Sequence, residues 1–143
     1  MAAGIPVAAA SSSKNAQLFL SRIRLDTFAQ EHGICLPCVR PGLTLLDFFE
    51  ADVSGRDFTH GKPHPEMFLT AAHELGAAPE AAIVIEDAAA GIEAAKAGGM
   101  AAIGIARALD ADLLSAAGAE IVVTTLDQVD LAALADGQLA TKR

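Results

Sequence analysis

Short apolar runs alternate with amphipathic stretches along almost the whole chain, and this alternation constrains the fold more than any other feature. The apolar runs that predict buried strands span residues 5–10, 48–53, 82–85, 101–105 and 121–123. The stretches between them predict helices over residues 14–25, 65–75, 88–97 and 110–117, with a last helix from about Leu126. This order is typical of an α/β domain in which helices cover both faces of a parallel sheet.

Residues 30–44 interrupt the pattern. They show no hydrophobic period and are rich in glycine and proline, which predicts a loop or an insertion. A chain of 143 residues is long enough for one domain with a substantial core and short for two. We therefore expect a single domain over residues 1–143.

Charge and hydropathy exclude several classes of partner. The formal net charge is −8 and the basic residues are scattered, so no basic stripe exists to bind nucleic-acid phosphates or a membrane surface. No apolar run approaches the roughly 18–20 residues that span a bilayer, and the first residues lack the basic region of a secretory signal. We expect a cytoplasmic protein with no nucleic-acid or membrane partner.

Three polar clusters follow predicted strands, directly or after a short loop, and lie near helix starts. They are Ser11-Ser12-Ser13-Lys14-Asn15, Gly61-Lys62-Pro63-His64-Pro65 and Glu86-Asp87. In an open α/β sheet, ligands bind outside the carboxyl ends of the strands. Hydroxyl, ammonium and carboxylate groups distant in sequence can therefore face one crevice, and together they favour a phosphate site.

The serine cluster allows two interpretations. The Ser11 hydroxyl, followed by backbone N–H groups at a helix start, can bind a phosphate oxygen, and Lys14 and Asn15 can hold a second anionic group. Alternatively, Ser11 to Ser13 only cap a helix, with Ser13 as the N-cap. From these residues alone the capping role is favoured.

The other two clusters also have a chemical and a plainer interpretation. Because a residue before proline is pushed toward extended conformations, the Lys62 side chain projects away from the following helix and can neutralise a transferring phosphoryl group; otherwise it is a solvated loop lysine. Glu86 and Asp87 leave a buried strand together, which is costly unless they are solvated or bind a cation such as Mg²⁺. The plainer role for Asp87 is to cap the next helix, where Gly91 permits close packing.

The cysteines and histidines give weaker signals. Cys35 and Cys38, with His32 nearby, form a C-x-x-C pair that invites a thiol-redox or zinc role, but no second ligand pair accompanies it. His60, His64 and His73 have no metal-like spacing with any partner. We expect these histidines to lie at the surface or to support the residues that bind the ligand.

With these residues in view, the chain resembles the haloacid dehalogenase (HAD) superfamily, and within it the β-phosphoglucomutase-like branch. Ala10–Asn15 resembles the second motif of the superfamily, Gly61–Phe68 the third and Val84–Met100 the fourth. The resemblance covers almost the whole chain outside residues 30–44. It implies a HAD-like Rossmannoid fold, a three-layer α/β sandwich with a parallel sheet.

The resemblance also implies roles for the three clusters. Ser11 would hold an oxygen of the transferring phosphate and Lys62 would neutralise it. Glu86 and Asp87 would hold Mg²⁺, with Asp87 as the direct ligand. Ser13, Lys14 and Asn15 match positions that hold the non-transferring phosphate in phosphoglucomutases, which favours a sugar-phosphate mutase over a simple phosphatase. Ser12 is expected to bind substrate phosphate with them.

One part of the family pattern has no counterpart in these residues. The first motif, D-x-D-x-T or similar, carries the aspartate nucleophile and the general acid/base. Asp26 and Asp47 are the only aspartates before Asp52, and neither ends an apolar strand with a second aspartate two residues on. We expect an incomplete core without its nucleophile strand and helical cap, and so without activity by itself.

The missing strand would lie between the strands that lead to Ser11 and Asp87, and its absence would leave backbone groups unpaired. We therefore expect marginal stability, with self-association or complementation by another chain through those sheet edges. Three alternatives stay open: a phosphatase of small phosphorylated metabolites, a non-catalytic module that binds phosphate or Mg²⁺, and a thiol-redox role for Cys35 and Cys38.

Overall fold

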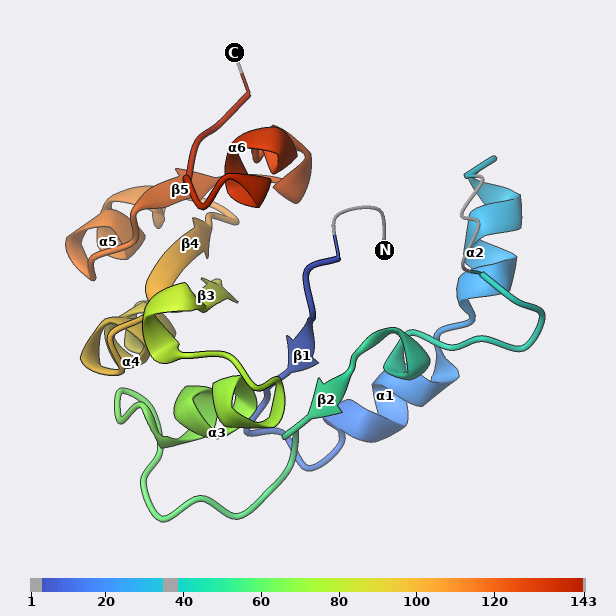
Figure 1. Ribbon diagram of the computed structural model, residues 1–143, viewed down its shortest axis with the longest axis horizontal. Coiled ribbons are helices and arrows are strands. Elements are labelled where there is room, and N and C mark those ends of the chain that lie inside the picture. The colour runs from blue at the N-terminus through green and yellow to red at the C-terminus, as the bar shows by residue number, and fades with distance from the viewer. Residues whose placement is uncertain (1–3, 35–38, 143) are drawn as a thin grey trace. The chain divides into compact units, whose positions relative to one another are not determined.

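The computed structural model describes residues 4–34 and 39–142, and the chain divides into two compact units, Met1–Asp57 and Phe58–Arg143. Each unit is described by itself, and Figure 1 gives the labels of its elements. Cys35 and Cys38 lie outside the described residues, so their thiol-redox or zinc role stays an untested prediction. No helix of the described residues is long and apolar enough to cross a membrane.

The first unit contains two short parallel strands, β1 (Ala8–Ala9) and β2 (Ala51–Asp52), paired Ala8 to Ala51. Further ladder bonds extend the pair in both directions: the N–H of Glu50 donates to the Val7 carbonyl at 2.8 Å and that of Val53 to the Ala9 carbonyl at 2.9 Å. Both strands therefore form where the apolar runs predict them. A 3-10 helix, Leu46–Phe48, takes the start of the second predicted strand.

The helix predicted over residues 14–25 is wrong in its extent, because two helices form there. They are α1 (Ala16–Arg22) and α2 (Leu25–Glu31), separated by extended backbone at Ile23 and Arg24. This segment pairs with the returning chain: Leu45 donates its N–H to the Ile23 carbonyl at 2.8 Å, and Arg24 bridges Thr44 in antiparallel sense. A non-local pairing therefore interrupts the helix, and α2 occupies the start of the loop predicted over residues 30–44.

The predicted cap and buried face of this first helix also need correction. The N-cap of α1 is Asn15, and not Ser13 as predicted. The Ser13 hydroxyl instead accepts the N–H of Asn15 at 3.3 Å, in the turn before the helix. The apolar residues Leu18, Phe19 and Ile23 of this amphipathic stretch are exposed. Packing within the described residues therefore does not cover this face.

The second unit contains a parallel sheet of order β3-β4-β5, as the alternation predicts. Its strands are β3 (Ile83–Glu86), β4 (Ala101–Ile105) and β5 (Ile121–Val123). Its helices are α3 (Glu66–Glu74), α4 (Ala89–Ala97), α5 (Ala111–Ala116) and α6 (Leu131–Ala135). Short 3-10 helices span Pro79–Ala81 and Leu126–Gln128, so the last helix begins later than predicted.

The two faces of this sheet are covered unequally. Helix α4 contacts β3 and β4, and α5 contacts β4 and β5, so both lie along one face (Figure 1). On the other face Ile103 and Val123 are buried with Val129 from the C-terminal segment. At the β3 end of that face, Ile83 and Ile85 stay exposed, so the predicted covering of both faces is only partial within this unit.

Candidate functional site

The centre of the candidate site is an ion pair between Lys62 and Glu86 in the second unit. Lys62 lies in the loop before α3, and Glu86 is the last residue of β3; the Lys62 ammonium contacts Glu86 Oε1. The Lys62 side chain is 23% exposed and that of Glu86 10%. Partial burial reduces solvent screening, so this pair is held more strongly than a surface salt bridge.

The second carboxylate oxygen of Glu86 binds the turn that follows β3. Glu86 Oε2 accepts the backbone N–H of Asp87 at 3.0 Å and that of Ala88 at 3.3 Å. The side chain lies directly against Gly91, where a Cβ atom would come within 2.2 Å of the Glu86 carboxyl carbon. Gly91 does permit close packing, as predicted, but its partner is the Glu86 side chain.

The surroundings of Lys62 hold its side chain in position and shift its pKa. Its Nζ lies 4.9 Å from the centre of the Phe68 ring, over the ring face, an attractive cation–π geometry. Burial lowers the pKa of Lys62 below its usual value, and the negative charge of Asp87 opposes that decrease. Lys62 is therefore not the solvated loop lysine of the plainer interpretation.

Asp87 pairs with a residue that the sequence analysis does not identify. Its Oδ2 lies 2.6 Å from Nη2 of Arg107, and the Asp87 side chain is 39% exposed. Arg107 follows β4, whose residue Gly104 is in register with Glu86, so both charged residues lie beyond the carboxyl ends of neighbouring strands. The sequence signal that marks Arg107 is its place as a basic residue just after a predicted strand. The N-cap of α4 is Ala88, so the capping role predicted for Asp87 is wrong.

These carboxylates fit a hard divalent cation. Mg²⁺ takes one or two protein carboxylates and completes its shell with water and substrate oxygens. Asp87 is 39% exposed and can offer an oxygen, whereas the Glu86 side chain is only 10% exposed and its carboxylate is paired with the Lys62 ammonium. The donor set therefore matches Asp87 as the direct ligand and Glu86 as the group that orients Lys62.

The serine cluster is built in the first unit. The Ser11 hydroxyl accepts the Ser13 N–H at 3.2 Å, and the Ser11 carbonyl accepts the N–H of Gly55 at 2.8 Å. Lys14 donates to the Gly55 carbonyl at 2.9 Å and pairs with Asp57. Gly55 has a φ of +68°, and a Cβ there would come within 3.2 Å of the Lys14 Cα, so only glycine suits this close approach.

The predicted phosphate-binding residues lie in both units, residues 11–15 in the first and Lys62 in the second. Ser12, Ser13, Lys14 and Asn15 are exposed, and Ser11 is half-buried. The structure brings Ser11 and Lys14 to neighbouring turns of the first unit, and brings Lys62, Glu86 and Asp87 together in the second. Phosphate binding by the serine cluster stays a prediction.

The two aspartates that precede Asp52 hold local structure. Asp26 pairs with Arg24 at 2.7 Å and accepts the N–H of Gly42 at 2.8 Å. These hydrogen bonds, first that from Arg24, hold the pKa of Asp26 far below its usual value. Asp47 accepts hydrogen bonds from the hydroxyl and the N–H of Thr44, which lower its pKa. Neither arrangement resembles a nucleophile held at a strand end.

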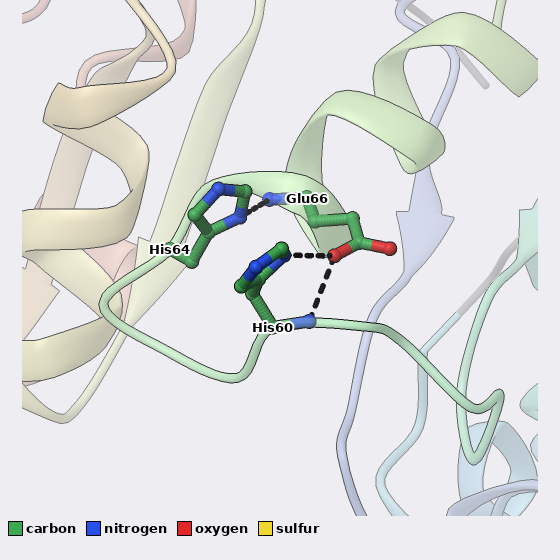
Figure 2. A group of neighbouring side chains, drawn as sticks. All are labelled: His60, His64 and Glu66. Carbon is green, nitrogen blue, oxygen red and sulfur yellow. Dashed lines mark hydrogen bonds and ion pairs between the residues drawn. The ribbon is translucent and has the colours of Figure 1, made fainter.

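A second group of side chains was not expected from the sequence. His60, His64 and Glu66 bring one potential ligand atom each within 4.8 Å of one another (Figure 2). The prediction that His60 and His64 lack a metal-like partner is therefore wrong, because the turn between them closes a distance that sequence spacing does not show. His73 is exposed on α3, as predicted.

Comparison with known proteins identifies the family of this chain. The model of a family described as haloacid dehalogenase-like hydrolase matches residues 1–99. The chain belongs to this family. The HAD-like hydrolase match includes the segments that contain Ser11, Lys62, Glu86 and Asp87.

Relatives of this HAD-like chain include phosphomutases and phosphatases. A β-phosphoglucomutase of Mycobacterium bovis is 39% identical over 132 residues, which cover 90% of this chain and 44% of that protein. The crystal structure of β-phosphoglucomutase from Clostridium difficile superposes with a TM-score of 0.65 at 27% identity, covering 94% of this chain and 49% of that one. Glycerol-1-phosphate phosphohydrolase 2 of Saccharomyces cerevisiae is 37% identical over 84 residues, 54% of this chain and 34% of that protein.

These similarities confirm the HAD fold and the β-phosphoglucomutase-like branch. The chain spans less than half the length of each of these relatives. Chemistry of the HAD phosphatase or phosphomutase type is therefore supported at the level of the family.

Proposed function

We propose that this chain supplies the lysine and the metal-binding carboxylate of a cytoplasmic, Mg²⁺-dependent phosphotransferase that acts on a sugar phosphate. The observation that carries the proposal is the half-buried Lys62–Glu86 pair beside Asp87 at the carboxyl end of β3. A fixed cation next to a carboxylate that can bind a divalent ion suits a dianionic phosphoryl group.

Each side chain has a separate task in this proposal. Lys62 neutralises an oxygen of the phosphoryl group, and Glu86 keeps its ammonium in place. Asp87 offers an oxygen ligand to Mg²⁺, and Arg107 holds the other side of that carboxylate. Mg²⁺, when bound, supplies charge neutralisation for the phosphate oxygens.

The sugar-phosphate part of the proposal rests on the serine cluster and on the relatives. Ser11 is proposed to bind the transferring phosphate, and Ser12 to Asn15 the non-transferring one. Four of these five side chains are exposed and can accept or donate hydrogen bonds to an anion. The similarity to β-phosphoglucomutases supports the same substrate class.

The proposed mechanism passes through an aspartyl-phosphate, and we propose that its aspartate lies outside these 143 residues. This proposal rests on the local hydrogen bonds of Asp26 and Asp47, because neither of these aspartates ends an apolar strand with a second aspartate two residues on. Without its nucleophile, covalent catalysis cannot begin.

A turnover assay of the purified 143-residue chain tests this step. With Mg²⁺ and β-glucose 1-phosphate or p-nitrophenyl phosphate, we expect a rate equal to that of the buffer. The Lys62→Met variant, purified in parallel, reports contaminating phosphatases. Turnover by the wild-type chain that the Lys62→Met variant lacks would overturn the proposed absence of a nucleophile.

A phosphatase of small phosphorylated metabolites is the second candidate, favoured by the similarity to a glycerol-1-phosphate phosphohydrolase. An assembled enzyme separates the two, because a mutase interconverts sugar phosphates whereas a phosphatase releases inorganic phosphate. A module that binds phosphate or Mg²⁺ without catalysis would show neither reaction.

A further inference from the structure

The loop before α3 gathers two imidazoles and a carboxylate in a way that the proposed phosphotransfer does not use. His60, His64 and Glu66 each offer a ligand atom within 4.8 Å of the other two. Figure 2 shows both rings and the Glu66 carboxylate on the same turn, which leads into the first turn of α3. Both histidines are exposed, so an ion can reach them from solvent.

Backbone hydrogen bonds hold this turn closed. Glu66 accepts the N–H of Thr59 at 3.1 Å and that of His60 at 2.9 Å, which fixes the start of the loop to the start of the helix. The His64 N–H donates to the Gly61 carbonyl at 3.0 Å. The two imidazole rings then stack with their centres 4.3 Å apart. The ligand atoms are therefore largely arranged before any ion binds.

One imidazole has an unoccupied nitrogen lone pair for an ion, and the lone pair of the other accepts only a long hydrogen bond. His60 Nδ1 lies 3.2 Å from Glu66 Oε2, and when it donates to that carboxylate its Nε2 carries the lone pair. His64 Nδ1 accepts the Glu66 N–H at 3.3 Å, a long bond that an ion can replace. A carboxylate that orients an imidazole in this way is a common companion of metal-ligating histidine.

We propose that His60, His64 and Glu66 bind a transition-metal ion that prefers imidazole, with Zn²⁺ as the representative, independently of the proposed phosphotransfer. Tetrahedral Zn²⁺ with bonds of about 2.0–2.1 Å needs ligand atoms about 3.4 Å apart. Small rotations of exposed side chains close the observed separation to that value. Water completes the coordination shell.

The donor types separate this site from the one proposed for Mg²⁺. Imidazole suits Zn²⁺, Ni²⁺ and Cu²⁺, whereas Mg²⁺ takes oxygen ligands. The candidate Mg²⁺ ligand, Asp87, follows β3, outside the loop that joins His60 to α3. Each ion is therefore expected to bind its own site without displacing the other.

Binding also has a consequence for Lys62, which lies between the two histidines in sequence. An ion bound by both histidines would cross-link the turn from which Lys62 reaches Glu86. Because the unfolded chain does not preassemble these ligands, the ion stabilises the folded second unit by mass action.

The test is a calorimetric titration of untagged full chain with Zn²⁺ at neutral pH. The protein carries Cys35→Ser and Cys38→Ser, because thiolates are themselves Zn²⁺ ligands. We expect one ion per chain, and about tenfold or greater weakening in His60→Asn and in His64→Asn. The matched control is His73→Asn, an exposed histidine on α3, which leaves the affinity unchanged. Excess Mg²⁺ does not compete.

Two further measurements distinguish a loss of Zn²⁺ ligands from a loss of folding in the variants. Far-UV circular dichroism confirms that each variant is folded, and Glu66→Gln, which keeps one oxygen acceptor for the loop, is expected to weaken Zn²⁺ binding. Zn²⁺ raises the melting temperature of the parent protein and not that of folded His60→Asn. Affinity that is absent, equally reduced by His73→Asn, or unchanged in His60→Asn and His64→Asn overturns the proposal.

Discussion

At the scale of single residues, the position of Glu86 depends on a glycine five residues further along the chain, in the first turn of α4. An added Cβ at Gly91 would fall 2.2 Å from the Glu86 carboxyl carbon and 2.4 Å from its Oε1. Gly91 lies inside α4, where alanine is ordinarily the better helix former by about 1 kcal/mol. The conformation of the backbone therefore does not require glycine here, but the neighbouring side chain does.

We predict that Gly91→Ala destabilises the second unit by about 1–3 kcal/mol, the usual effect of overpacking. Displaced Glu86 also loses its hold on Lys62. Urea unfolding followed by circular dichroism measures the change. In a Glu86→Ala background the clash is gone, so Gly91→Ala should become neutral or stabilising there. An equal destabilisation in both backgrounds would contradict the role assigned to Gly91.

The Asp26 carboxylate gives a prediction about pH. Hydrogen bonds from Arg24 and from the Gly42 N–H lower the pKa of Asp26 in the folded state, below the value near 3.9 in unfolded chains. A group whose folded pKa is lowered stabilises the fold above the unfolded pKa and loses this effect as the pH falls through the folded pKa. Asp26 should therefore stabilise the first unit at neutral pH.

Asp26→Asn tests this linkage. The variant should unfold at lower urea concentration than wild type at pH 7, and the difference should shrink as the pH falls below about 4. The control is Glu31→Gln, at an exposed position on the same helix. A difference between Asp26→Asn and wild type that stays constant from pH 7 to pH 3 would show that the ionised carboxylate is not responsible.

The candidate site could be predicted from sequence only where its residues belong to local patterns. Lys62, Glu86 and Asp87 follow strands or precede helices in recognisable motifs, and the structure brings them together. The pairing of Arg107 with Asp87 and that of His60 with Glu66 depend on how chain segments meet. A basic residue after a predicted strand marks Arg107 but does not identify its partner.

At the scale of elements, the same distinction explains which bounds could be predicted. The bounds of β4, β5 and α4 agree closely with those predicted from the hydrophobic pattern. Their buried faces define them locally, and Gly98 and Gly99 end α4. The break between α1 and α2 could not be predicted, because Ile23 and Arg24 are held extended by hydrogen bonds to residues 43–45. Tertiary pairing there outweighs helix propensity.

Strand β3 leads to a prediction about association. In the part of the chain that the structure describes, it pairs only with β4, and its residues Ile83 and Ile85 are 38% and 52% exposed. An outer strand with apolar side chains favours pairing with a second chain. We predict that the protein self-associates reversibly and that its melting temperature depends on concentration.

Ile85→Thr keeps a β-branched side chain and removes apolar surface, so it should weaken this association. Sedimentation equilibrium measures the change. The control is Leu109→Thr, at a fully exposed position away from any strand. Equal effects of the two substitutions, or a concentration-independent monomer in the wild-type protein, would contradict association through β3.

At the scale of the whole molecule, the family could be predicted from sequence because its motifs are short and each lies in one segment. Substrate choice could not, because this chain matches only part of the relatives whose names give a substrate. The chain covers 44% of the β-phosphoglucomutase of Mycobacterium bovis. We propose that Lys62 and Asp87 serve phosphoryl transfer when an aspartate nucleophile is supplied.

The most direct measurement joins this chain to the portion of the Mycobacterium bovis relative that it does not match, and assays the turnover of β-glucose 1-phosphate with Mg²⁺. We predict turnover by the chimera and a loss of about 100-fold or more in its Lys62→Met and Asp87→Asn variants, each folded by circular dichroism. The control substitution Asp112→Asn, at an exposed position of α5, should retain activity. A folded chimera without turnover, or one that turns over equally well without Lys62 or Asp87, would contradict the account.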